Sequence, residues 1–111
     1  MAAYTPRKGD FVVLTFDPQS GHEQRGRRPA LVVSNDLFNQ HTGLCIACPI
    51  TSARRDYPFH LPVPEGCEVD GVVMVEQVKS IDYRARRAKP IGTAPEPLLQ
   101  EALALLDACL Y

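Results

Sequence analysis

Short apolar runs separated by glycine and proline make up most of the chain. The strongest runs lie at residues 10–16, 30–33, 44–51 and 72–75, and their length and β-branched content predict strands. Both faces of the first run are apolar, with Phe11 and Val13 on one face and Val12, Leu14 and Phe16 on the other. We therefore expect this strand to be covered on both sides. The fourth run is expected to continue as a strand through Val78.

Weaker patterns fill the remaining segments. Ser34 and Asn35 are expected to cap a short helical turn. Because Pro49 cannot donate a hydrogen bond, the strand at 44–51 is expected to bend, to bulge or to lie at a sheet edge at that residue. Prolines interrupt a weaker strand within residues 57–63, and residues 84–91 predict a strand rich in positive charge. Thr93 is expected to cap a C-terminal helix whose apolar stripe is Leu98, Leu99, Ala102, Leu103, Leu106 and Leu110.

These elements predict a mainly β fold, a small antiparallel barrel with a C-terminal helix. The 111 residues suit a single domain spanning 1–111. A barrel this small is expected to cover one face of the first strand internally and to leave the other for a partner. Leu106, Cys109 and Leu110 add apolar surface near the C-terminus, so we expect a twofold homodimer.

Targeting signals are not visible in the sequence. No apolar run approaches the length that spans a bilayer, and no basic segment precedes an apolar stretch at the N-terminus. The expected compartment is the cytosol, with no membrane association. The composition, with 45% hydrophobic residues, is that of an ordinary globular protein.

The four cysteines include a Cys45-x-x-Cys48 pair, a spacing that occurs in zinc and redox sites. Residues three apart on a strand point to opposite faces, so the two sulfurs are expected to diverge. No second Cys or His pair lies at zinc spacing. We therefore expect reduced, half-buried thiols and no metal site.

Positive charge is clustered although the net charge is only −1. The basic clusters are Arg25, Arg27 and Arg28, then Arg54 and Arg55, then Arg84, Arg86, Arg87 and Lys89. Such segregation is typical of a basic face that binds a polyanion. The alternative is that these arginines scatter over different surfaces, and the sequence leaves both interpretations open.

The charged loop from Pro18 to Pro29 is the strongest candidate for chemistry. It holds three arginines, a glutamate, a histidine and two glycines between two apolar strands. A proton-transfer group beside fixed positive charge is what chemistry on a phosphodiester requires. The alternative is a solvated hairpin tip, as most charged loops are.

The sequence resembles the MazF/PemK family of bacterial toxins over nearly its whole length. The resemblance depends on Lys8-Gly9-Asp10, Phe16-Asp17-Pro18, Gly21-His22-Glu23-Gln24-x-Gly26-x-Arg28-Pro29-Ala30, Asn39-x-x-Thr42-Gly43, Pro49-Ile50-Thr51-Ser52, Asp70-Gly71-Val72, Gln77-Val78-Lys79-Ser80-Ile81-Asp82 and Arg84-Ala85-Arg86. Any one of these blocks is a weak signal. All of them, in order and in a chain of this length, form a specific match.

The resemblance implies a small SH3-like barrel that works as a homodimer. It implies an mRNA interferase, a ribonuclease that cuts single-stranded RNA at short sequences with no metal ion or other cofactor. The expected products are a 2′,3′-cyclic phosphate and a 5′-hydroxyl, because the attacking nucleophile is the 2′-hydroxyl of the RNA. The resemblance also implies an antitoxin whose acidic, disordered tail blocks the active groove.

Four residues are candidates for catalysis. Arg28 matches the family's phosphate-stabilising arginine, and a guanidinium suits a phosphate in charge and shape; the alternative is a structural pair with Glu23. Glu23 matches the family's acid–base glutamate, which a nearby arginine would keep ionised. Thr51 matches a position where a hydroxyl contacts the scissile phosphate, with a strand-end capping hydroxyl as the alternative.

His22 is the fourth candidate, and its role is ambiguous. An ordinary histidine titrates near neutral pH, which suits proton transfer, and one branch of the family uses a histidine here. That branch also uses an arginine and an aspartate on a later strand, where this chain has Met74 and Glu76. The departure argues against transferring that branch's mechanism whole.

Further residues are candidates for contacting RNA: Arg25, Arg27, Ser52, Gln77, Lys79, Arg84 and Arg86. Single-stranded RNA is read through splayed bases with hydrogen-bonding and stacking partners. Phe38, Tyr57 and Phe59 could stack on bases but are better interpreted as core. His41 and His60 are expected in a turn and in a strand.

A second class of function stays open. A related toxin family with this fold binds DNA gyrase and does not cut RNA. The loop with Glu23 and Arg28 favours the nuclease, because a protein binder needs no proton-transfer group beside clustered arginine.

Overall fold

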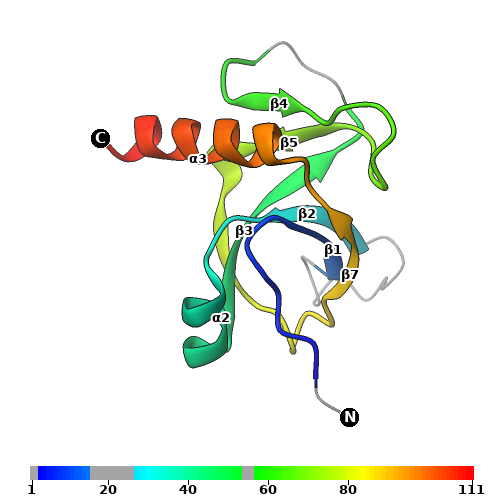
Figure 1. Cartoon of the computed structure of the whole chain (residues 1–111), viewed down its shortest axis with the longest axis vertical. Coiled ribbons are helices and arrows are strands. Elements are labelled where there is room, and N and C mark those ends of the chain that lie inside the picture. Colours follow the sequence, from blue (N-terminus) through cyan, green and yellow to red (C-terminus); the bar gives the residue numbers. More distant parts are fainter. Residues whose placement is uncertain (1–2, 16–26, 54–56) are drawn as a thin grey trace.

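The structure is a computed structural model of the chain (Figure 1), in which residues 3–15, 27–53 and 57–111 are described. Its strands are β1 (Asp10–Thr15), β2 (Arg27–Val32), β3 (Leu44–Thr51), β4 (His60–Pro62), β5 (Val72–Met74), β6 (Lys79–Asp82) and β7 (Lys89–Thr93). Its helices are α2 (Asp36–Thr42), the short 3₁₀ helix η2 (Val75–Gln77) and α3 (Glu96–Leu110).

The strands pair in the order β4-β5-β3-β2-β1-β7, and β6 pairs with β3 away from this path. Every recorded pairing is antiparallel. Among the described strands β4 and β7 end the order without pairing to each other, so the sheet is strongly curved rather than a closed barrel. The predicted fold class, mainly β with a C-terminal helix, is confirmed.

Both faces of the sheet carry a core. The helix-side core lies between the sheet and α3 and is built from Phe11, Leu31, Cys48, Ile50, Val73, Val75, Leu98 and Ala102 with their neighbours. The opposite core consists of Val12, Leu14, Ala30, Val32, Cys45, Ala47, Ile81 and Tyr83. The strand alternation of β1 supplies both cores, because Phe11 enters one and Val12 and Leu14 enter the other.

This arrangement corrects the argument for a dimer from β1. Phe11, Val12 and Leu14 are all fully buried within one chain, so β1 needs no partner subunit to cover it. The folding chain covers the second face with β6 and with the segment holding Tyr83. Exposed apolar residues remain at the end of α3, where Leu110 and Tyr111 stand in solvent.

The central strand β3 follows the prediction from Leu44 to Thr51. Its first half pairs with β6 on one side, through residues 44–47, and its last two residues pair with β5 on that side. Pro49 lies between the residues that pair with β6 and those that pair with β5. Its missing N–H therefore interrupts no hydrogen bond to either strand. Pro49 therefore marks the position at which β3 passes from one partner strand to the other.

The Cys45 and Cys48 side chains diverge as expected, with Cys45 in the opposite core and Cys48 in the helix-side core. Both thiols are free. Burial disfavours the thiolate and raises the pKa of Cys45 to about 11, and burial, with a smaller effect of Glu76, raises that of Cys48 to about 12. The pair thus behaves as two unrelated core residues.

Alkylation should distinguish the buried thiols of Cys45 and Cys48 from the exposed thiol of Cys109 by their rates of modification. Because thiolates are the reacting species, Cys45 and Cys48 are expected to stay unmodified by iodoacetamide in the native protein at mildly alkaline pH. They should react once urea unfolds the chain, as peptide mapping by mass spectrometry would reveal. Modification of either residue in the native protein at the rate of a free thiol would contradict this burial.

Three local expectations are wrong. Thr93 does not cap α3: it pairs with Asp10 as the last residue of β7, and α3 begins after Pro95 with no side-chain cap. The strand at 72–75 ends at Met74, because Val75 turns into η2 while its N–H donates to the carbonyl of Phe59. Residues 84–91 are not one strand, since a turn with Arg87 at φ 58° separates β6 from β7.

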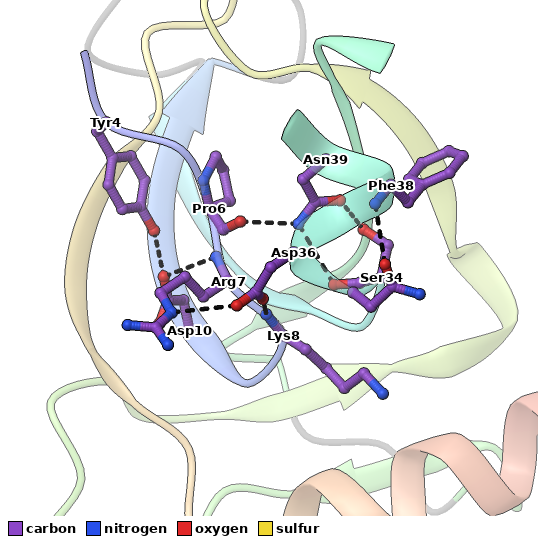
Figure 2. Close-up of polar contacts among 10 residues, drawn as sticks. Tyr4, Pro6, Arg7, Lys8, Asp10, Ser34, Asp36, Phe38 and Asn39 are labelled. Carbon is purple, nitrogen blue, oxygen red and sulfur yellow. Dashed lines mark hydrogen bonds and ion pairs between the residues drawn. The ribbon is translucent and has the colours of Figure 1, made fainter. Parts of the chain in front are cut away.

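The N-terminal segment is held against α2 by buried polar contacts (Figure 2). The side chain of Asn39, fully buried, donates to the carbonyl of Pro6 at 2.8 Å and accepts from Ser34 Oγ. Asn35 caps α2 as predicted by accepting from the Phe38 N–H at 2.9 Å. These contacts explain why the motif containing Asn39 contributes to the fold rather than to a surface site.

Acidic residues complete this attachment. Asp36 accepts from the Lys8 N–H at 3.1 Å and pairs with the Arg7 guanidinium at 3.3 Å. Asp10 accepts from the Arg7 N–H and from the Tyr4 hydroxyl, and burial together with this contact raises the pKa of Tyr4.

Of the helices in the described residues, none is long and apolar enough to cross a membrane.

Candidate active site

Arg28 and Thr51 lie on the same face of two neighbouring strands. The recorded β2–β3 pairs are Ala30 with Pro49, Leu31 with Cys48, and Val32 with Ala47. Continuing this register by two residues brings Arg28 opposite Thr51. Both follow the alternation of the opposite-core face, so their side chains leave the sheet on one side.

The two side chains differ in exposure. Arg28 is exposed, while Thr51 is half-buried at the end of β3. Thr51 Oγ1 accepts from the Ala53 N–H at 3.2 Å, a local turn contact that orients the hydroxyl. An exposed guanidinium on the same face as an oriented hydroxyl is an arrangement that suits an anion such as a phosphate.

Gly71 fixes the backbone of Thr51 from the other side. It has a φ of 130°, and a Cβ placed on it would overlap the carbonyl oxygen of Thr51. Gly66 also has a positive φ, of 88°, but a Cβ there would meet nothing. The two glycines therefore separate the effect of backbone strain from that of displacing Thr51.

Gly71→Ala is expected to destabilise the protein by about 2 to 5 kcal/mol, because strain and overlap add. Gly66→Ala should cost about 1 to 2 kcal/mol from strain alone. Urea unfolding at equal protein concentration measures both. Under conditions where both variants are folded, we expect Gly71→Ala alone to lose the RNA-cleaving activity that the family resemblance implies. Equal RNA cleavage by the two variants would refute the positioning of Thr51 by Gly71.

A pocket of about 290 Å³ opens next to Thr51. It is lined by Thr51, Ala53, Tyr57, His60, Met74, Glu76 and Gln77. Within it, His60 Nε2 lies 2.9 Å from Glu76 Oε2, and the His60 side chain is only 7% exposed. Gln77, predicted to contact RNA, is exposed on η2 at this pocket.

Arg27 points to the other face of β2 and makes structural contacts. Its guanidinium donates to Thr15 Oγ1 at 3.2 Å, to the Val13 carbonyl at 3.3 Å and to the Arg87 carbonyl at 2.9 Å. These bonds tie the end of β1 to the turn between β6 and β7. They favour a structural role for Arg27, whereas the side chain of Arg28 leaves β2 on the opposite face.

The remaining predicted RNA contacts spread over three regions. Ser52 is exposed directly after β3, and Lys79 is exposed at the start of β6, next to Gln77. Arg84 and Arg86 lie in the turn after β6, and Arg86 also approaches the Thr15 carbonyl at 3.5 Å. Ser52 follows the end of β3 and Gln77 precedes Lys79 at the start of β6, whereas Arg86 lies beside the end of β1, where its carbonyl accepts from the Thr15 N–H at 2.9 Å.

His22, Glu23 and Arg25 lie outside the described residues, so their roles stay predictions. His41 is in α2 rather than in a turn, and His60 is in β4 as expected. The pairing of His60 with Glu76 is the feature that the sequence analysis missed. The only sign of it in the sequence is that His60 and Glu76 lie on two neighbouring apolar runs, and the prolines around His60 make the first of these runs hard to recognise as a strand.

Comparison with known proteins places this architecture in a family of toxins. Residues 7–110 match the family described as PemK-like, MazF-like toxin of type II toxin–antitoxin system. The endoribonuclease toxin MazF of Escherichia coli K12 is 46% identical over 99 residues, 88% of each chain. The endoribonuclease toxin ChpB of the same strain is 46% identical over 106 residues, 91% of this chain and 90% of its own.

Solved structures agree with the sequence relatives. MazF of Deinococcus radiodurans has a TM-score of 0.88 at 45% identity, covering 97% of this chain and 98% of that one. A MazE–MazF structure from the same organism has a TM-score of 0.86 at 40% identity over 97% of each chain. The chain belongs to the PemK/MazF family.

Proposed function

We propose that this chain is a sequence-specific, metal-independent endoribonuclease that cleaves single-stranded RNA. The 2′-hydroxyl of the RNA attacks the neighbouring phosphorus, the bond to the 5′-oxygen breaks, and a 2′,3′-cyclic phosphate and a 5′-hydroxyl remain. The alignment of Arg28 with Thr51 on one face, beside the pocket, is the observation that carries the proposal. The curated relatives named as endoribonucleases support the class of enzyme.

The proposed roles follow from the chemistry of each side chain. Arg28 binds the scissile phosphate and stabilises the charge that develops on the phosphorane. Thr51 donates its hydroxyl hydrogen to a phosphate oxygen. Glu23 takes the proton from the 2′-hydroxyl as general base and delivers a proton to the leaving 5′-oxygen as general acid, and His22 is the competing candidate for proton transfer.

RNA is proposed to lie along the ends of β2, β3 and β6. Ser52, Gln77 and Lys79 flank this path, and Arg25, Arg84 and Arg86 supply positive charge for the backbone. Arg27 contributes indirectly by holding the end of β1 in place. The whole chain, residues 1–111, acts as one domain in the bacterial cytosol.

A cognate antitoxin is the proposed protein partner. The MazE–MazF structures of Deinococcus radiodurans support such a complex. An acidic, flexible segment of the antitoxin would occupy the same arginine-bearing surface as RNA, so binding should weaken as salt rises. The proposed homodimer would cover the exposed apolar end of α3, with Leu110 and Tyr111.

The test is incubation of the purified protein with a long single-stranded RNA in EDTA, followed by mapping of both ends at each cut. Discrete cuts with cyclic phosphate and 5′-hydroxyl ends are expected, because Arg28 supplies the charge that a metal would otherwise provide. Cleavage that EDTA abolishes and magnesium restores would overturn the mechanism. Absence of cuts under all conditions would favour the alternative, a toxin that binds a protein such as DNA gyrase.

A further inference from the structure

The guanidinium of Arg27 crosses the end of β1 and bonds to acceptors on both sides of it. On β1 it donates to Thr15 Oγ1 at 3.2 Å and to the Val13 carbonyl at 3.3 Å, and beyond β1 it donates to the Arg87 carbonyl at 2.9 Å. Arg27 is half-buried and Thr15 is only 7% exposed, so these bonds lie largely out of bulk water. Hydrogen bonds from a charged donor in such a place are among the stronger ones in proteins.

The turn that presents the Arg87 carbonyl is itself firmly held. Arg87 has a φ of 58°, a left-handed conformation that is unfavourable for a residue with a Cβ and persists where its surroundings impose it. Its N–H donates to the Arg84 carbonyl at 3.1 Å. The neighbouring Arg86 carbonyl accepts from the Thr15 N–H at 2.9 Å. The turn therefore offers Arg27 an acceptor that is fastened to the end of β1.

The start of β2, which carries Arg28, depends on these bonds because its strand pairing is incomplete. Residues 27 and 28 pair with β1, whereas the recorded pairs with β3 begin at Ala30. Pro29 has no N–H, so it cannot donate to a neighbouring strand. In the described part of the chain, the side chain of Arg27 thus supplies fastening that the backbone ladder lacks at this end of β2.

We propose that Arg27 is a positioning residue for the ribonuclease reaction, acting through Arg28. The two side chains leave β2 on opposite faces, so a backbone fastened through Arg27 directs Arg28 toward the face of Thr51. Arg27 directs its bonds into the protein and touches no phosphate. The inference rests on the proposed ribonuclease function.

Steady-state cleavage of a defined RNA, under conditions where urea unfolding shows each sample to be folded, tests this role. Arg27→Ala is expected to lower kcat by roughly threefold to tenfold, far less than Arg28→Ala, with KM nearly unchanged, because a small displacement of the phosphate-binding group acts on the transition state. Arg27→Lys keeps the charge but not the fork, and should remain close to Arg27→Ala. Arg7→Ala removes the same charge from an exposed pair with Asp36 and should change neither constant.

A double-mutant cycle isolates the action through Arg28. In the Arg28→Ala background no guanidinium is left to position, so adding Arg27→Ala should change kcat by less than about twofold. If the two separate losses multiply instead, Arg27 does not act through Arg28 and the inference is wrong. Thr15→Val removes one acceptor of Arg27 but keeps a β-branched side chain, so it serves in the same cycle if Arg27→Ala does not fold. Its smaller loss in kcat should also vanish in the Arg28→Ala background.

The salt dependence of RNA binding separates positioning from a direct phosphate contact. An RNA with a 2′-deoxy nucleotide at the cut site lacks the attacking hydroxyl and allows binding to be measured alone. The slope of log Kd against log salt should be the same for Arg27→Ala and the wild type, and a slope smaller by about one in the variant would make Arg27 a phosphate contact.

The remaining outcomes distinguish this inference from the proposed function. A wild-type kcat in folded Arg27→Ala, with normal cleavage by the wild type, would overturn the role of Arg27 alone. Recovery of the full wild-type kcat in Arg27→Lys would do the same, because charge without the fork would then suffice. Absence of RNA cleavage by the wild type would overturn both proposals.

Discussion

Arg28→Ala should slow RNA cleavage by about a hundredfold or more, because it removes the preorganised charge that the phosphorane requires. The side chain is exposed on β2, so its loss should scarcely change the stability of the fold. The measurement is the single-turnover rate on a defined RNA at saturating enzyme, with urea unfolding of the same sample.

Two matched variants sharpen this result. Arg28→Lys keeps the positive charge but loses the planar fork, and it should recover only part of the rate. Arg27→Ala should show the opposite pattern, because the Arg27 guanidinium donates to the backbone of β1 and of the turn after β6. We expect this variant to have reduced stability but, once folded, a cleavage rate closer to that of the wild type. A normal rate in Arg28→Ala would remove Arg28 from the mechanism.

Glu23→Gln is expected to lose roughly a hundredfold to ten-thousandfold in rate if Glu23 transfers the proton, since the amide keeps shape and hydrogen bonding but is no base. His22→Asn should then lose much less, and its pH–rate profile should keep an acidic limb. The profile of kcat/KM against pH for both variants provides the check.

The reverse pattern would exchange the two roles. If His22→Asn is as damaging as Arg28→Ala while Glu23→Gln stays active, Glu23 only orients Arg28 and His22 carries the proton. The chain has Met74 and Glu76 where the histidine-bearing branch has arginine and aspartate, so we expect Glu23 to dominate. Glu76 is instead bonded to His60.

The strands that could be predicted are those whose apolar alternation is long. β3 was predicted from Leu44 to Thr51, and the divergence of Cys45 and Cys48 followed directly from its alternation. Short strands carry less information: β5 stops at Met74, where η2 begins, although the Val75 N–H still donates to the Phe59 carbonyl in the register of β4 and β5. Arg87 adopts a positive φ without any glycine to signal the turn.

The site was predictable only in part for similar reasons. Arg28 and Thr51 could be identified by resemblance, but their alignment depends on the register of β2 against β3, which no local pattern encodes. Arg27 looked like a second RNA contact because charge alone cannot tell a solvent-facing guanidinium from one bonded to backbone carbonyls. The bond between His60 and Glu76 required the tertiary fold.

The position of β3 has an evolutionary consequence. Thr51 stands at the end of a strand that is anchored in both cores and in three neighbouring strands, β2, β5 and β6. The pocket wall beside it comes instead from short elements, β4 and η2, with their exposed flanks. If Thr51 contacts the scissile phosphate as proposed, substitutions in those short elements would reshape the pocket without moving that hydroxyl. Under the proposed function, the recognised RNA sequence would therefore be free to change while the residues of the cleavage step stay in place.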